Sequence, residues 1–184
     1  MPAKKREHTQ LIVVCDSKTN ARKNWGVKEI NRNAINAGIF TDSGPTGVHY
    51  VITRNGSVAN GRPPAFVGSH INSIDSRAVY IMLIGGMNQG ETEIKDTFTD
   101  GQMIALLGVV RRMVALYPDA AVIPSGLVSV MDEGPAFDVM NWASEHFGPG
   151  NLTKYHNYRA AKAAEPPPDL SFLDKLLWAE DYGQ

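Results

Sequence analysis

The chain has 184 residues, of which 43% are hydrophobic and 20% charged, and its formal net charge at pH 7 is −1. This composition is typical of one globular domain and excludes an intrinsically disordered chain, while the scattered basic residues provide no broad cationic face for nucleic acid. No apolar run approaches the roughly 20 residues that span a bilayer, so we expect no membrane insertion. The single cysteine, Cys15, excludes an internal disulfide and favours a reducing, cytoplasmic setting.

The first half of the chain predicts a strand, a helix and a hairpin. Residues 10–15 form a compact β-branched run, the pattern of a strand buried on both faces. Apolar residues recur at helical spacing over 26–36, which predicts a short amphipathic helix. The pair Asn55-Gly56 separates the runs 48–53 and 57–60, and it predicts a β-hairpin because both residues tolerate positive φ.

The second half predicts two more strands and two helices. Residues 78–84 and 120–123 indicate a buried strand and a short strand. Thr99 and Gln102 have the spacing of a capping box, which predicts the start of the longest helix, ending before Pro118. A further helix is predicted with Pro135 in its first turn. Its inward side chains are expected to be Phe137, Met140 and Trp142.

This order predicts an α/β fold with a mixed central β-sheet flanked by helices, since the hairpin pairs antiparallel and helix crossovers pair strands parallel. We expect a basic N-terminal arm over 1–9, the main domain over 10–150, and a proline-containing linker with a C-terminal helix over 151–184. That helix either folds back on its own domain or docks on a partner. Its apolar side chains include Leu173, Leu177 and Trp178.

Several short segments resemble the type-two N-acetylmuramoyl-L-alanine amidases, and among them the small lysozymes of T-odd podophages, which have the peptidoglycan-recognition-protein fold. The resemblance covers roughly residues 10–147, and each segment alone is only weakly specific. The segments are Gly47 to Val58, Val67 to His70, Leu83 to Gly86, Phe98 to Met103 and Gly134 to Asp138.

The resemblance implies a zinc site of three protein ligands with an open position for water. The matching positions hold Cys15, Gly126 and Gly134. A thiolate can bind zinc, but glycine has no side chain to do so. Because affinity depends on the number of donors, we expect no tight metal binding and no cofactor.

Other positions that the resemblance assigns to catalysis or to the substrate groove also depart from the family. A tyrosine is replaced by Val48, a lysine by Asp132, and a glycine by Tyr80, which is expected to alter or fill the groove. Asp16, His49 and His70 are left as candidate groove residues. Two readings of them stay open: a packing role, and a rewired metal site. A nucleophilic role for the cysteine is disfavoured, since a cysteine that ends an apolar strand is usually a small core residue.

These losses predict a catalytically inactive binding or regulatory protein of phage origin. By analogy with the resembling lysozymes, its partner would be a phage RNA polymerase or another phage or host protein, bound through Lys4, Lys5 and Arg6 or through the C-terminal helix. One alternative is a non-cutting peptidoglycan-binding or virion-associated module. A second alternative is an active N-acetylmuramoyl-L-alanine amidase whose metal site has moved.

Overall fold

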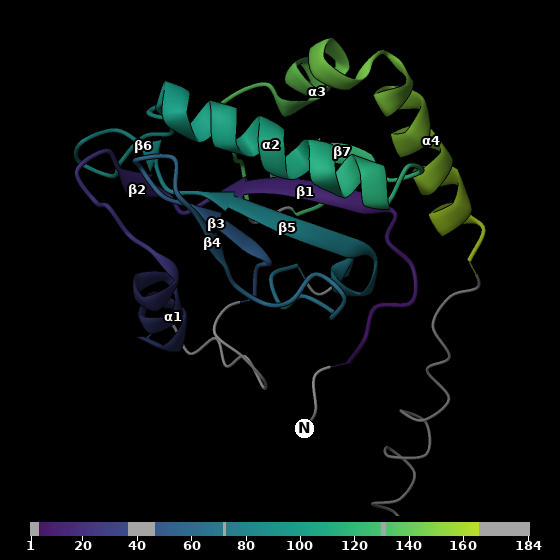
Figure 1. The fold of residues 1–184 in the computed structure, drawn as a ribbon, viewed down its shortest axis with the longest axis horizontal. Helices are drawn as coiled ribbons and strands as arrows, with labels where there is room; N and C mark the ends of the chain where they lie inside the picture. The colour runs from purple at the N-terminus through teal and green to yellow at the C-terminus, as the bar shows by residue number, and fades with distance from the viewer. Residues whose placement is uncertain (1–3, 37–46, 72, 130–131, 166–184) are drawn as a thin grey trace, which may run out of the picture.

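The computed structural model describes residues 4–36, 47–71, 73–129 and 132–165, and its elements form a mixed sheet between two layers of helix (Figure 1). The predicted C-terminal helix and its three apolar residues lie outside the described residues. The strands are β1 (Leu11–Asp16), β2 (Thr19–Asn20), β3 (Tyr50–Ile52), β4 (Val58–Asn60), β5 (Ala78–Leu83), β6 (Gly86–Met87) and β7 (Ala121–Pro124). The α-helices are α1 (Val27–Asn36), α2 (Asp100–Leu116), α3 (Val139–Phe147) and α4 (Gly150–Ala163), and short 3-10 turns cover Asp75–Arg77 and Ser125–Leu127.

The main sheet has the order β4-β3-β5-β1-β7 and confirms the predicted mixed α/β class. Strands β3, β5, β1 and β7 are parallel, and the hairpin partner β4 is antiparallel. The central strand β1 pairs on both sides, with Val13 opposite Tyr80 of β5 and Ile123 of β7. The carboxyl ends of the parallel strands therefore meet at one edge, where Asp16 lies opposite Leu83.

Each face of the sheet carries its own core, because alternate residues of a strand point to opposite faces. From β1, Ile12 and Val14 face the layer that contains α2 and α3, while Leu11, Val13 and Cys15 face the opposite layer. All five are fully buried, so β1 is covered on both faces as its sequence predicts. In Figure 1, α2 crosses one face of the sheet and α1 lies beyond the other.

Helix α2 begins as its sequence predicts. The Thr99 side chain accepts a hydrogen bond from the Gln102 backbone N–H, and the Gln102 side chain accepts one from the Thr99 N–H. The fully buried Gln102 amide also donates to the carbonyl oxygens of Ile52 and Ile84. One glutamine therefore caps the helix and fastens it to two strands of the sheet.

The hairpin is confirmed, but its turn differs from the two-residue form that Asn55-Gly56 favours. Only Gly56 has a positive φ, at 81°, and the Thr53 N–H donates to the Ser57 carbonyl oxygen. The loop therefore spans three residues and needs just one left-handed position, which glycine takes without steric cost. Asn55 instead accepts hydrogen bonds through its side chain from the Thr53 hydroxyl and the Ser57 N–H.

The helices that follow β7 depart from the sequence prediction. Helix α3 begins at Val139 with Asp138 as its N-cap, so Pro135 precedes it and does not form its first turn. Helix α4 was not predicted, and it packs against β7 and α3, which extends the packed unit past residue 150. Its Asn151 side chain donates to the Val122 carbonyl and accepts from the Val122 N–H, both at 2.8 Å. This amide covers the edge of β7 as a neighbouring strand would.

Candidate functional site

Three charged side chains meet at the carboxyl edge of the sheet, and we call them the Lys18 cluster: Asp16, Lys18 and Asp132. Asp16 ends β1, Lys18 follows two residues later, and Asp132 lies in the loop between β7 and α3. The Lys18 Nζ atom is 3.3 Å from Asp16 Oδ1 and 3.3 Å from Asp132 Oδ1. One ammonium group therefore bridges two carboxylates, at the strand ends where open α/β sheets commonly hold ligands.

The backbone aims Lys18 at this point. Its φ is 52°, a left-handed conformation that is uncommon for a residue with a side chain. Asp16 Oδ1 accepts a hydrogen bond from the Lys18 N–H at 3.3 Å, a local turn of the kind that aspartate forms with the chain two residues on. The neighbouring Ser17 N–H donates to the Leu83 carbonyl oxygen, which ties the turn to β5.

Two glycines make room for the cluster. A Cβ atom on Gly134 would lie 2.4 Å from Lys18 Nζ and 3.0 Å from Asp16 Oδ2. A Cβ atom on Gly86, whose φ is +97°, would lie 2.2 Å from Asp16 Oδ2. Real side chains do not approach this closely, so the ammonium and the carboxylate occupy space that a larger residue at either position would need.

The two carboxylates have opposite electrostatic environments. Burial raises the pKa of Asp16, and the ammonium of Lys18 only partly offsets this effect. The Asp16 side chain is fully buried, and its Oδ2 atom has no hydrogen-bond partner among the described residues. At Asp132, burial also acts to raise the pKa, but the Ser125 hydroxyl, the Gly134 N–H at 2.9 Å and Lys18 outweigh it and lower the pKa. Asp132 is therefore the more readily ionised carboxylate of the pair.

A cleft of about 490 Å³ lies beside the Lys18 cluster. Asp132 and Gly134 line it together with residues from the end of β7 and the start of α3, including Pro124, Leu127, Phe137 and Val139. The Lys18 side chain is 36% exposed but its Nζ atom is buried, whereas the Asp132 side chain is 17% exposed and lines the cleft. A carboxylate in this position can accept a proton from water.

The residues at the positions that the resemblance assigns to zinc ligands do not fit a zinc ion. Gly126 and Gly134 supply no donor, and the Lys18 ammonium lies where a side chain at residue 134 would begin. Cys15 is fully buried, and burial raises the pKa of its thiol well above the ordinary value, which disfavours a nucleophilic role. Within the described ranges, no group of three or more His, Cys, Asp or Glu side chains could hold a metal ion. The rewired set of Asp16, His49 and His70 is therefore not assembled.

His49 has a structural role in the fold. Its Nδ1 atom accepts from the Tyr80 N–H at 2.9 Å, which leaves Nε2 as the protonated nitrogen facing the Phe66 carbonyl oxygen at 2.9 Å. The ring is fully buried, and burial lowers its pKa to about 4. Both nitrogens are thus engaged by backbone, and the imidazole is neutral at pH 7. Of the two roles left open for His49, packing and metal binding, these backbone hydrogen bonds favour packing.

Tyr80 lies in the core on the face of the sheet opposite α2, and the effect of its ring on a substrate groove stays a prediction. The ring is fully buried, and its hydroxyl donates to Asp75 Oδ1 at 2.7 Å. A Cβ atom on Gly68 would lie 2.6 Å from the ring. His70, which is exposed at the surface, meets the same ring edge-on, with centroids 5.2 Å apart. Val48 is buried in the same core as Tyr80.

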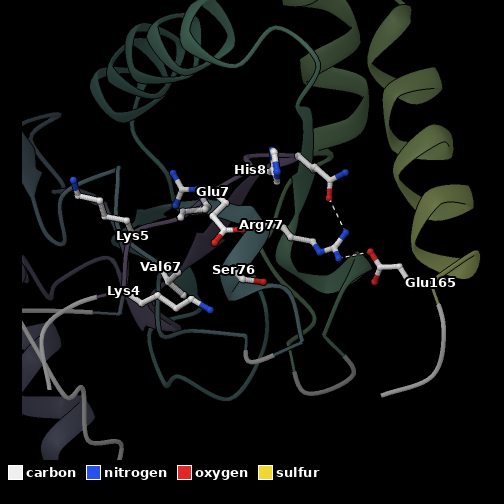
Figure 2. A pocket seen from close by; sticks show the side chains of 10 residues that line it. Lys4, Lys5, Glu7, His8, Val67, Ser76, Arg77 and Glu165 are labelled. Carbon is white, nitrogen blue, oxygen red and sulfur yellow. Dashed lines mark hydrogen bonds and ion pairs between the residues drawn. The ribbon is translucent and has the colours of Figure 1, made fainter. Parts of the chain in front are cut away.

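The N-terminal arm is fastened to the domain at its basic residues. Lys5 forms a β-bridge with Phe66, and the Arg6 guanidinium donates to the carbonyl oxygens of Phe66, Ala78 and Pro64. A hollow of about 390 Å³ lies beside this arm, where Figure 2 shows Lys4 and Lys5 to one side and the Arg77–Glu165 ion pair at the other. It borders Gln10 at the start of β1, so it lies at the opposite edge of the sheet from the Lys18 cluster.

Sequence reasoning identified Asp16, Asp132 and Gly134 but missed Lys18. The spacing of Asp16 and Lys18 is consistent with a local turn, yet nothing in the sequence indicates the left-handed backbone or the approach of residues 132–134. These features depend on contacts between segments more than a hundred residues apart.

Comparison with known proteins gives a consistent family. The chain is 34% identical over 140 residues to an endolysin of Enterobacteria phage K11, a match that covers 76% of this chain and 87% of the relative. It is 30% identical over 139 residues to an endolysin of Escherichia phage T7, covering 76% and 88%. No family model matches the sequence.

Solved structures agree on the fold. The N-acetylmuramoyl-L-alanine amidase LysC from Clostridium intestinale URNW superposes with a TM-score of 0.62 at 22% identity, covering 79% of this chain and 89% of the amidase. Drosophila peptidoglycan recognition protein SD superposes with a TM-score of 0.61 at 16% identity, covering 78% and 85%. These likenesses confirm the amidase and peptidoglycan-recognition-protein fold that the sequence segments indicated.

The same findings correct the functional expectation. The prediction of an inactive binding or regulatory protein is contradicted, because the relatives of 34% and 30% identity are endolysins. They point to an enzyme and give no support to an RNA polymerase partner.

Proposed function

Since this chain belongs to the family of phage endolysins, we propose that it acts on bacterial peptidoglycan and hydrolyses the amide bond between N-acetylmuramic acid and L-alanine. The observation that carries the proposal is the 34% identity to an endolysin over 87% of that relative's length. The bond is the one named for the amidases that share the fold.

The cleft beside the Lys18 cluster supplies a place for the substrate. It combines apolar lining from Leu127 and Phe137 with the accessible carboxylate of Asp132. Few polar groups in a mostly apolar cleft are typical of sites that orient a ligand. A peptide stem can lie along the apolar lining with its amide group beside the carboxylate of Asp132.

The setting follows from the family. The substrate is the wall of the infected bacterium, and the protein is made in that cell's cytoplasm. No helix among the described residues is long and apolar enough to cross a membrane.

Purified protein added to peptidoglycan sacculi tests the proposal. We expect the turbidity of the suspension to fall and each cleavage to release one new N-terminal L-alanine, identified by mass spectrometry of the soluble fragments. Cleavage at sugar–sugar bonds, or intact sacculi after prolonged incubation at high protein concentration, would refute the assignment. Co-sedimentation with sacculi, measured in parallel, separates a protein that binds the wall without cutting it from one that does neither.

A further inference from the structure

The ammonium of Lys18 lies at the centre of a cation site. It is within 3.3 Å of two carboxylate oxygens from separate segments, and a missing side chain at residue 134 leaves the room it occupies. The Asp16 side chain beside it has no exposed surface, and its Oδ2 atom has no partner in the described part of the chain. A buried carboxylate of this kind requires a positive charge or a proton close by.

We propose that the Lys18 ammonium is the resident cation of this site, occupying the place that a zinc centre takes in the amidase family, so that the protein works without a bound divalent metal. The inference rests on the proposed function for its biological meaning. Its physical content, which cation the two carboxylates hold, is independent of activity.

The local backbone supports a dedicated lysine position. A residue with a side chain at φ 52° is uncommon, and it persists only where the surroundings hold it. Here the Lys18 N–H donates to the same carboxylate whose Oδ1 atom faces the ammonium. The local turn and the ion pair with Asp16 therefore favour the same conformation of Lys18.

The donor set gives the second argument. Zinc sites need three or more nitrogen, sulfur or oxygen donors, whereas the carboxylates at this point number two, and neither Gly126 nor Gly134 adds another. A divalent ion would have to displace an ammonium group held by two carboxylates, and it would gain few ligands in exchange. The same geometry predicts how a metal site could be restored.

Three variants of the full chain test the proposal: Lys18→Ala, Gly134→Cys, and the two combined. The combined variant places a thiol beside two carboxylates after the ammonium is removed. The single Gly134→Cys change adds the thiol while the ammonium still fills the space. Lys23→Ala is the matched control, because Lys23 forms an ion pair with Glu91 at 2.7 Å outside the Lys18 cluster.

Zinc content after dialysis and titration with zinc chloride near neutral pH are the measurements. We expect wild type, Gly134→Cys and Lys23→Ala to bind no stoichiometric zinc, Lys18→Ala to bind weakly, and the combined variant to bind at least about a hundredfold more tightly than wild type. Should the cysteine variants fail to fold by circular dichroism, the comparison of wild type with Lys18→Ala still decides, because only the latter frees the two carboxylates.

Wild-type protein that retains one zinc per chain would overturn the proposal. So would equal zinc affinity in Gly134→Cys and the combined variant, or a folded combined variant that binds no zinc. Wall cleavage by the same wild-type preparation separates the two ideas. If the protein contains zinc and cleaves the wall, and cleavage stops when the zinc is chelated, this inference is wrong and the proposed function stands. If the protein contains no zinc and does not cleave the wall, the inference about the cation stands and the proposed function is wrong.

Discussion

Lys18 and Gly134 form a matched pair: a Cβ atom at residue 134 would stand 2.4 Å from the Lys18 Nζ atom, so the lysine can occupy its position only while residue 134 is glycine. The pair joins the turn after β1 to the loop before α3. We therefore expect the effects of mutations at these two residues on the free energy of unfolding to be coupled.

Gly134→Ala should destabilise the wild-type protein by about 1–3 kcal/mol, the usual cost of forcing a methyl group into a filled site. In a Lys18→Ala background the same change should cost much less, because the ammonium is gone. Chemical denaturation of the four proteins in this double-mutant cycle measures the coupling. Gly108→Ala is the control: nothing lies within 4 Å of its Cβ position in α2, so it should leave stability unchanged or raise it slightly. Purely additive costs at residues 18 and 134 would contradict the contact.

Asp132→Asn should slow cleavage of peptidoglycan by about a hundredfold, the lower range for removal of a proton-accepting side chain. The fold should survive, since an amide oxygen can still accept the hydrogen bond from the Gly134 N–H. Initial rates of turbidity loss and the thermal midpoint of each protein are the measurements. Glu133→Gln serves as the comparison, because Glu133 lines the same cleft next in sequence. Equal rates for Asp132→Asn and wild type would exclude an active role for this carboxylate.

His49 should make the protein less stable in acid. Its pKa is about 4 in the folded protein, against an ordinary value of 6.5, so the unfolded chain takes up the proton first as pH falls. The contribution of neutral His49 to the free energy of unfolding is fully present above pH 6.5. It is lost as the pH falls from 6.5 to about 4, and the total loss is roughly 3 kcal/mol. The difference in unfolding free energy between wild type and His49→Gln should shrink over that window. Substitution of the exposed His156 by Gln should leave the pH profile as it is, and a constant difference for His49 would show that the ring titrates normally.

Asp16 should have the opposite pH dependence. Its pKa is raised in the folded protein, so the folded state holds its proton longer and loses stability relative to the unfolded state as pH rises above 3.8. Asp16→Asn removes this decline, and the stability of wild type relative to the variant should fall between acid and neutral pH. Denaturant midpoints over this range give the measurement. A relative stability that rises with pH would mean that the ion pair with Lys18 outweighs burial.

Arg6 should stabilise the domain although it lies in the N-terminal arm. Arg6→Ala removes a guanidinium that donates to several carbonyl oxygens, including that of Ala78 at 2.9 Å, and should cost about 1.5–3 kcal/mol. Lys5→Ala should cost little, since the β-bridge of Lys5 to Phe66 is made by backbone. Unfolding curves of the two variants, recorded together, provide the test. Equal stability of both variants and wild type would mean that the arm is not fastened in solution.

The sequence by itself determined the fold class, the order of the elements and the family. The compact apolar runs of the strands, the capping box at Thr99 and Gln102, and the glycine of the hairpin act within a few residues, so they can be recognised in the sequence. Helix α4 escaped notice because its anchors, Asn151 and Tyr155, have meaning only against β7 and the loop that follows it.

Only the tertiary structure decided the chemistry of the site. The sequence shows two glycines where ligands are expected, and this observation, together with the departures at Val48, Asp132 and Tyr80, led to the prediction of an inactive protein. The fold brings Asp16, Lys18 and Asp132 to one edge and directs an ammonium into the space beside Gly134, because parallel strands end together and a glycine leaves volume for a distant side chain. Charge, volume and proximity between segments more than a hundred residues apart are properties of the folded chain, and no local pattern encodes them.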